Sequence, residues 1–145
     1  MKFKKQKRKT PKSERQKQKD RTWKYCSKYI RLRDCLATTG TTDFGVCCTC
    51  GRTKHIKELD AGHYISGRSN SVLFNDKGIH IQCRKCNRFE EGNKGEYEKF
   101  MLEKYGAEEC ERQKNAKHLS VSLSLFELKA LELDYKQKLK TLKGE

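Results

Sequence analysis

The sequence predicts a small α+β protein in which a β-hairpin and a helix are fastened by two cysteine pairs, with further helices on either side. Two CxxC motifs, Cys47–Cys50 and Cys83–Cys86, enclose a loop of 32 residues. That loop contains two short runs typical of strands, and the segments around it show helical periodicity. With 145 residues, 34% of them hydrophobic and 37% charged, the chain has room for one modest domain with a small core.

Residues 1–22 form a basic segment that we expect to be a disordered arm. The chain carries a net charge of +15, and residues 1–24 hold twelve Lys and Arg against Glu14 and Asp20. Such a run buries too little apolar surface to fold alone, and it is suited to neutralising nucleic-acid phosphates. A solvated tail is the simpler alternative. No apolar stretch is long enough for a membrane span and no secretory signal is visible, so we expect an intracellular protein without a membrane partner.

The first predicted helix spans residues 23–36. Aromatic and aliphatic residues recur there every three or four positions, which is typical of a helix face that packs on a core. Gly40 follows the end of this pattern. The opposite face is basic, with Lys24, Lys28 and Arg31. The helix could therefore pack on the core and still face a polyanion, although packing is the simpler role.

The main domain is predicted to comprise residues 23–106. Inside it, residues 59–65 and 78–82 have the character of short strands, and a further helix is expected to begin near the second cysteine pair. The segment from Lys94 is helical in pattern and stops at Gly106.

Residues 107–145 are predicted to be a helical extension. Ser124 and Glu127 make an S-x-x-E capping box ahead of a long amphipathic run. Apolar residues recur along that run every three or four positions, from Leu128 to Leu142. This stripe is expected to pack on the core or on a second copy of the chain, and the second arrangement would make a homodimer.

The four cysteines of the CxxC motifs predict a structural zinc site. Thiolates suit tetrahedral zinc, and Gly51 permits a sharp exit from the first turn. Four protein ligands leave no open position for catalysis, so we expect this ion to hold the fold. Cys48 in place of Cys47 is the one ambiguity of register. The remaining cysteines are expected to be buried thiols without a ligand role: Cys26, Cys35, Cys48 and Cys110.

Polar residues inside and beside the loop indicate a second, catalytic site. Asn87 follows Cys86 directly, and Glu91 lies one helical turn further, on the same face if a helix begins there. Amide and carboxylate oxygens suit Mg²⁺ or Mn²⁺. Across the cysteine pairs stand Asp60 and His63, and a histidine can take a proton from water. These groups suffice for cutting a phosphodiester bond with one metal ion.

The ordered motifs CxxCG, DAGHYISGR, FNDKGIHIQCRKCN and GN resemble the phage NinG (Rap) recombination proteins, which belong to the HNH, or ββα-metal, endonuclease group. The resemblance covers residues 23–106 and includes YCSKYIRLRD. It implies a treble-clef-like ββα-metal core with His63 as general base and Asn87 as the final metal ligand. It also implies action on branched DNA, including Holliday junctions, with Mg²⁺ or Mn²⁺ as the working metal.

Two positions depart from the HNH pattern. A metal-binding Asp or His commonly precedes the base, but Gly62 stands here. Asp60 shares its strand face, so Asp60 is the expected substitute ligand, about 6–7 Å further along. Where a middle Asn commonly supports the base, this chain has Gly78. Asn75 or His80 is the candidate replacement, and His80 could itself be the base with the first histidine as a ligand.

The sequence thus predicts a metal-dependent DNA endonuclease for recombination intermediates, encoded by a phage and working in the bacterial cytoplasm beside phage or host recombination proteins. Arg68 and Arg88 are candidate phosphate contacts or simple surface charges. The alternative is a zinc-containing DNA-binding accessory protein without catalysis, which the glycine before the histidine favours. RNA is a third option for the target.

Overall fold

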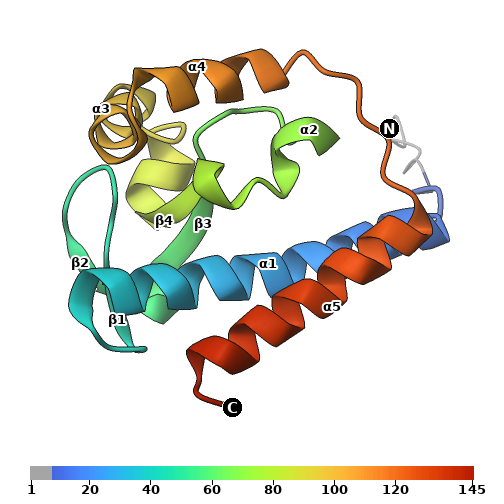
Figure 1. The fold of residues 1–145 in the computed structure, drawn as a ribbon, viewed down its shortest axis with the longest axis horizontal. Helices are drawn as coiled ribbons and strands as arrows, with labels where there is room; N and C mark the ends of the chain where they lie inside the picture. The colour runs from blue at the N-terminus through green and yellow to red at the C-terminus, as the bar shows by residue number, and fades with distance from the viewer. Residues whose placement is uncertain (1–7) are drawn as a thin grey trace, which may run out of the picture.

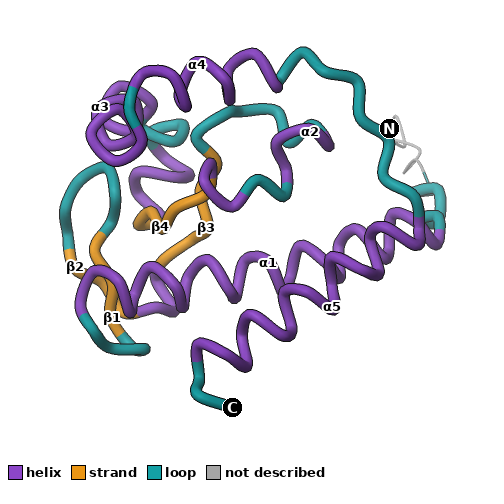
Figure 2. Tube along the Cα trace, in the orientation of Figure 1, coloured by secondary structure: helices purple, strands orange, loops and turns teal. Residues whose placement is uncertain are grey.

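The computed structural model describes residues 8–145, and the α+β class is confirmed (Figures 1 and 2). Two long helices, α1 (Glu14–Thr39) and α5 (Leu125–Leu142), lie side by side along one side of the molecule. Two small antiparallel sheets and the helices α3 (Lys94–Tyr105) and α4 (Ala107–Ala116) make up the remainder. The short helix α2 (Asn70–Leu73) lies in the loop between the strands of the second sheet.

The first sheet pairs β1 (Phe44–Val46) with β2 (Thr53–His55). The second pairs β3 (Leu59–His63) with β4 (Ile79–Cys83), so both predicted strands of the hairpin are confirmed to within two residues. Single turns precede or follow these strands: η1 (Ile56–Glu58), η2 (Asp76–Gly78) and the π-helical turn η3 (Lys85–Phe89). In the second sheet, Gly62 lies opposite His80.

Helix α1 begins nine residues earlier than predicted, which corrects the expected disorder of residues 14–22. The Ser13 side chain accepts a hydrogen bond from the Gln16 N–H and caps the helix. Gln18 and Thr22 are buried, and the Thr22 hydroxyl donates to the Leu128 carbonyl of α5 at 2.9 Å. The basic sequence is therefore helical because α5 covers one side of it. Residues 1–7 of the predicted arm lie outside the described residues.

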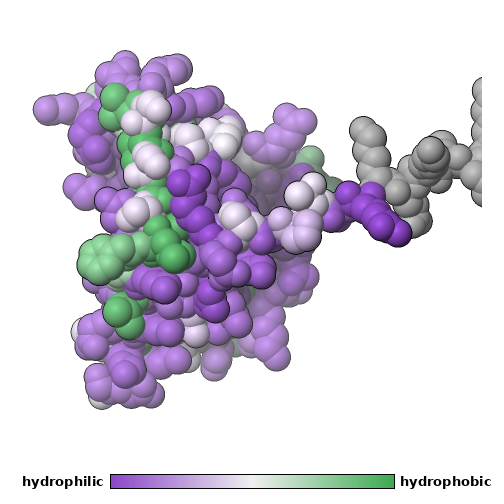
Figure 3. Space-filling model, turned by 90° about the vertical axis from the view of Figure 1, so that its right-hand side faces the viewer, coloured by the Kyte–Doolittle hydropathy of each residue, from purple (hydrophilic) through white to green (hydrophobic). Residues whose placement is uncertain are grey.

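The apolar stripe of α5 packs within the chain. Leu128 and Tyr135 are fully buried, and Tyr135 joins Cys26, Ile30 and Ile79 in one hydrophobic cluster. Of the two expected roles of the stripe, packing within the chain is the one that the structure shows, and the homodimer stays a prediction. Some apolar side chains remain exposed, and Figure 3 shows hydrophobic surface gathered into a strip on the face drawn there. The exposed apolar residues of α5 and of the segment before it include Leu119, Val121, Phe126 and Leu133.

The four cysteines outside the CxxC motifs behave as predicted. Cys26, Cys35 and Cys110 are buried, and Cys48 is half-buried against a second cluster. That cluster contains Tyr97 and Met101 from α3. Among the described residues, no helix is long and apolar enough to cross a bilayer.

Candidate functional site

The sulfur atoms of Cys47, Cys50, Cys83 and Cys86 all lie within 4.8 Å of one another, as the CxxC motifs predict. The Sγ atoms of Cys50 and Cys83 are 3.7 Å apart. Sulfurs bound tetrahedrally to one zinc ion at about 2.3 Å would be separated by about 3.8 Å. The cluster is therefore suited to a structural zinc ion.

Local backbone geometry produces this convergence. The Gly51 N–H donates to the Cys47 carbonyl at 3.0 Å, and Gly51 has a φ of 76°, a conformation that favours glycine. Burial opposes ionisation of the Cys47 thiol, but the Thr49 hydroxyl and nearby N–H groups lower its pKa to about 6. Zinc binding requires thiolate, and Cys47 can supply it, whereas burial raises the pKa values of Cys50 and Cys83. Cys47 and Cys50 lie in the turn between β1 and β2, Cys83 ends β4 and Cys86 lies in η3. The cluster therefore fastens the first sheet to the end of the hairpin and to the turn that follows it.

His63 is the last residue of β3, and its ring is held from two directions. Nε2 lies 3.0 Å from the Leu73 carbonyl oxygen. Because a carbonyl only accepts, Nε2 carries the proton and Nδ1 holds the lone pair. The ring also stacks on the Trp23 indole of α1, with centroids 5.0 Å apart and planes 24° apart.

The electrostatic surroundings of His63 keep its imidazole neutral. Burial lowers the pKa of His63, and the positive charges of Arg68 and Lys94 lower it further, against the hydrogen bond to Leu73. Nδ1 has no hydrogen-bond partner among the described residues, and it is not sealed from solvent as Nδ1 of His80 is. The imidazole can therefore accept a proton through Nδ1 at neutral pH.

His63 lines a cavity of about 260 Å³ together with Asn87 and Glu91. The other lining residues are Trp23, Ala61, Ser66, Arg68, Gly92 and Lys94. The Lys94 ammonium donates to the carbonyls of His63 at 2.5 Å and of Tyr64 at 3.0 Å, so the start of α3 is tied to the end of β3. His63 and Asn87, which the sequence predicts to face each other, thus line one cavity.

Asp60 and Asn87 are also in contact, as the strand-face prediction requires. The Asn87 amide donates to Asp60 Oδ2 at 3.1 Å. Arg88 makes a bidentate ion pair with the same carboxylate, at 2.8 and 2.9 Å. Over the described part of the chain, the four cysteines are the one group of three or more histidine, cysteine or acidic residues whose ligand atoms converge. A second metal at Asp60 would therefore require Arg88 to move.

The prediction that Glu91 shares a helix face with Asn87 is wrong. The turn η3 ends at Phe89, and Glu91 has a φ of 51°, so the i+4 spacing of a helix does not apply. A glycine, Gly92, follows directly and also has positive φ, which is incompatible with continuing the helix. Glu91 nevertheless reaches the His63 cavity from this loop.

The structure explains why glycine, and not a metal-binding residue, stands at position 62 before His63. A Cβ at this position would clash with Oε1 of Gln82, and it would lie 3.1 Å from Oδ1 of Asn87. Gln82 is fully buried, and its amide donates to the Thr49 hydroxyl at 3.2 Å and to the Gly92 carbonyl at 2.8 Å. The side chain of Gln82 thus takes the space in which a residue before His63 would place its own.

Neither candidate for the support of His63 acts on its ring. His80 is buried against Phe100, and its Nε2 lies 2.9 Å from the Tyr105 hydroxyl. Burial, with Arg33 and Lys104 nearby, lowers the pKa of His80 to about 3, so this residue is not suited to be the base. Asn75 lies at the start of η2, where its amide nitrogen approaches Gly78. The support comes from the Leu73 carbonyl, a backbone group that no sequence motif reveals.

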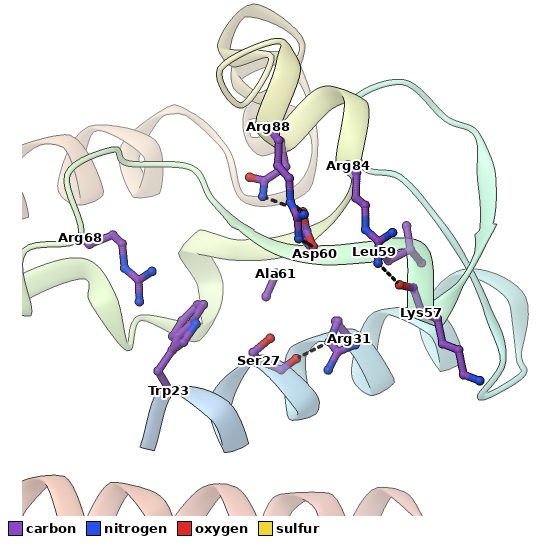
Figure 4. A pocket seen from close by; sticks show the side chains of 11 residues that line it. Trp23, Ser27, Arg31, Lys57, Leu59, Asp60, Ala61, Arg68, Arg84 and Arg88 are labelled. Carbon is purple, nitrogen blue, oxygen red and sulfur yellow. Dashed lines mark hydrogen bonds and ion pairs between the residues drawn. The ribbon is translucent and has the colours of Figure 1, made fainter. Parts of the chain in front are cut away.

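A second cavity of about 440 Å³ adjoins the first, and both are lined by Trp23, Ala61, Arg68 and Asn87. It lies between α1 and the hairpin (Figure 4). Its walls carry five cationic side chains: Arg31, Lys57, Arg68, Arg84 and Arg88. Among the described residues, only Arg88 of these five has an acidic partner.

Three predicted phosphate contacts, Arg31, Arg68 and Arg88, are brought together here. Lys24 and Lys28 do not line this cavity, and the Lys28 ammonium lies over the Tyr25 ring at 5.5 Å. The sequence interpretation missed Lys57 and Arg84. Arg84 directly follows Cys83, so its position beside the cysteine cluster was a usable signal.

Comparisons with known proteins agree with these motifs. A family model described as bacteriophage lambda NinG protein matches residues 1–145. Protein ninG of Escherichia phage lambda is 32% identical over 99 residues, which cover 68% of this chain and 48% of the relative. Protein ninG of Salmonella phage P22 is 32% identical over 98 residues, covering 67% and 47%. The chain thus spans about half the length of these curated relatives, and no solved structure matches it. The chain belongs to the phage lambda NinG family.

Proposed function

We propose that the protein is a metal-dependent endonuclease that cuts branched DNA, with a ββα-metal core of the HNH kind. One observation carries the proposal: the imidazole of His63 is held neutral at the wall of a cavity that also contains the Asn87 amide and borders a groove of arginines. The chain's membership of the NinG family supports the same reading, because the resemblance implies that His63 is the general base and Asn87 the last metal ligand.

His63 would act as the general base. Its Nε2–H is engaged by Leu73, so Nδ1 would take a proton from a water molecule in the cavity. The resulting hydroxide would attack phosphorus, and the bond from phosphorus to the 3′-oxygen would break. The leaving oxygen would take a proton from solvent, which leaves a 5′-phosphate and a 3′-hydroxyl. The Lys94 ammonium, which donates to the carbonyls of His63 and Tyr64, would hold the backbone at the base in place.

Asn87 and Asp60 are the oxygen donors best placed to hold a divalent ion, with Glu91 at the same cavity. Mg²⁺ or Mn²⁺ bound there would stabilise the negative charge that develops on the phosphate. The donor types fit such an ion. Asp60 is now paired with the Arg88 guanidinium, so it can bind a metal ion only if Arg88 pairs with another anion instead. A phosphate of the DNA substrate would serve as that anion.

The groove favours a substrate recognised by shape. Arginine and lysine side chains from α1, η1, the loop between β3 and α2, and the region of η3 would bind phosphate without reading bases. The groove-lining side chains include no unstacked aromatic residue, because Trp23 already contacts His63 and Arg68. Binding should therefore be independent of sequence and weaken steeply with salt.

A nicking assay tests the function directly. Wild type, His63→Ala and the control His55→Ala would be incubated with a four-way junction and with plasmid, in Mg²⁺, Mn²⁺ or chelator. We expect metal-dependent cutting by wild type and by His55→Ala, whose histidine lies on β2, and a loss of at least about 100-fold for His63→Ala. Equal activity of His63→Ala and wild type would exclude His63 from the mechanism.

The second candidate function is DNA binding without cleavage, as a recombination accessory protein. The closed Asp60–Arg88 pair and the absence of a convergent second metal cluster among the described residues favour it. Tight, salt-sensitive binding of junctions with no cutting in any metal would establish this function. Competition between matched DNA and RNA junctions in the same assay would identify the sugar that is preferred.

A further inference from the structure

We propose that Trp23 of α1 is a positioning residue for His63, and that its indole fixes the plane of the imidazole at the cavity wall. The inference rests on the proposed role of His63 as the base. Trp23 lies forty residues before His63 in the chain, and no motif of the cysteine loop includes it. Helix α1 is thereby a component of the catalytic site as well as of the core.

Two contacts are needed to fix an imidazole. The bond from Nε2 to the Leu73 carbonyl fixes one point of the ring, but the ring could still turn about that bond and swing Nδ1 along the cavity wall. Stacking on the indole, at 5.0 Å between centroids and 24° between planes, removes that rotation. With both contacts, the lone pair of Nδ1 has one direction.

The place of Trp23 in the molecule supports this role. Its indole lines both the His63 cavity and the arginine groove. The Arg68 guanidinium lies over the same indole, 4.9 Å from its centroid, and Arg68 has a φ of 50°, an uncommon conformation for a residue other than glycine. A stack of guanidinium, indole and imidazole therefore connects the groove to the base. The groups that face the imidazole are Arg68, Lys94 and Glu91.

The test uses the full, zinc-loaded chain with Trp23→Leu, Trp23→Met and the conservative Trp23→Phe. For junction cleavage in Mn²⁺, we expect kcat of the Leu and Met variants to fall about 10- to 100-fold with little change in KM, because misplacement of a base mainly slows the chemical step. Trp23→Phe should recover most of the rate. Phe44→Leu, which removes an aromatic contact with His55 on the first sheet, is the matched control and should leave kcat unchanged.

An NMR titration of His63, without DNA or divalent ion, separates this inference from the proposed function. In wild type, the indole ring current should shift the imidazole C–H resonances upfield, and the pKa should lie below that of an exposed histidine. Both effects should decrease in Trp23→Leu and Trp23→Met. If wild type cuts no DNA, the endonuclease proposal fails while the titration still decides the stacking. Absence of the upfield shift in wild type, or a folded Leu variant with wild-type kcat and His63 pKa, would overturn the inference.

Discussion

His63 and His80 lie on paired strands of one hairpin, yet their surroundings give them different chemistry. The His63 ring lines an open cavity, and its Nδ1 is available to solvent. The His80 ring is enclosed by aromatic rings, and its Nδ1 is buried without a hydrogen-bond partner. The register places Gly62 opposite His80 and His63 opposite Ile79, so the two imidazoles leave the sheet on opposite faces. The hairpin therefore holds one histidine that packs in the core and another, His63, for which we propose proton transfer.

The proposed cleavage activity should persist to lower pH than an ordinary histidine base would allow. Burial and the nearby Arg68 and Lys94 lower the pKa of His63, so its proton-accepting form persists to lower pH than that of an exposed histidine. We expect kcat/KM for junction cleavage to fall on the acid side with an apparent pKa below 6.5. Trp23→Leu should raise the apparent pKa of that acid side. An acid limb at or above 6.5 in wild type would contradict the environment described for His63.

His80 should make the folded state sensitive to acid. Its pKa is lowered from 6.5 to about 3, so the unfolded chain binds a proton that the folded chain does not. Stability from this group is present above pH 6.5 and is lost as the pH falls toward 3. Between pH 6.5 and 5, wild type should lose about 1.5–2 kcal/mol more than His80→Phe does. Urea unfolding in excess zinc measures this, with His55→Ala expected to behave like wild type.

At the scale of elements, the sequence predicted best what short-range patterns determine. The strands of the hairpin, α3 with its stop at Gly106, and the capping box of α5 all follow local rules. The early start of α1 did not follow, because Gln18 and Thr22 become buried only when α5 packs on them. The end of the turn after Asn87 was missed for a similar reason: the loop through Glu91 takes positive φ values.

The same division applies to the candidate site: local sequence patterns predicted part of it, and tertiary contacts determine the remainder. Cysteine spacing identified the cluster, and strand alternation placed Asp60 beside Asn87. Pairing of Arg88 with Asp60, the use of the Leu73 carbonyl and the filling of space at Gly62 all depend on tertiary contacts. Sequence periodicity contains no information about them.

The packing of α5 on α1 gives a test at this scale. Leu128 is fully buried at the point where Thr22 bonds to its carbonyl. Leu128→Ala should lower the free energy of unfolding by about 2–5 kcal/mol, through lost burial and the cavity left behind. Leu133→Ala, on the same helix but 66% exposed, should change it by less than about 0.5 kcal/mol. Equal losses in both variants would show that α5 does not pack as described.

At the scale of the whole molecule, the cysteine cluster joins β1, β4 and η3 and so holds together a core of modest size. We expect one zinc ion per chain, measured by elemental analysis. Chelation or Cys50→Ser should release it and unfold the hairpin region, because ligand binding and folding are coupled in small zinc domains. Cys110→Ala removes a buried thiol outside the cluster and should keep one zinc per chain. A chain that folds identically without metal would refute this coupling.

The continuity of α1 also sets a distance. The helix runs without interruption from Glu14 through Trp23, so its basic first turn lies about 14 Å along the helix axis from the Trp23 that lines both cavities. At about 3.4 Å per base pair, that length corresponds to about four base pairs. In the proposed reaction, the phosphates protected by the first turns of α1 should therefore lie at a constant number of base pairs from the cut bond, whatever the nucleotide sequence between them.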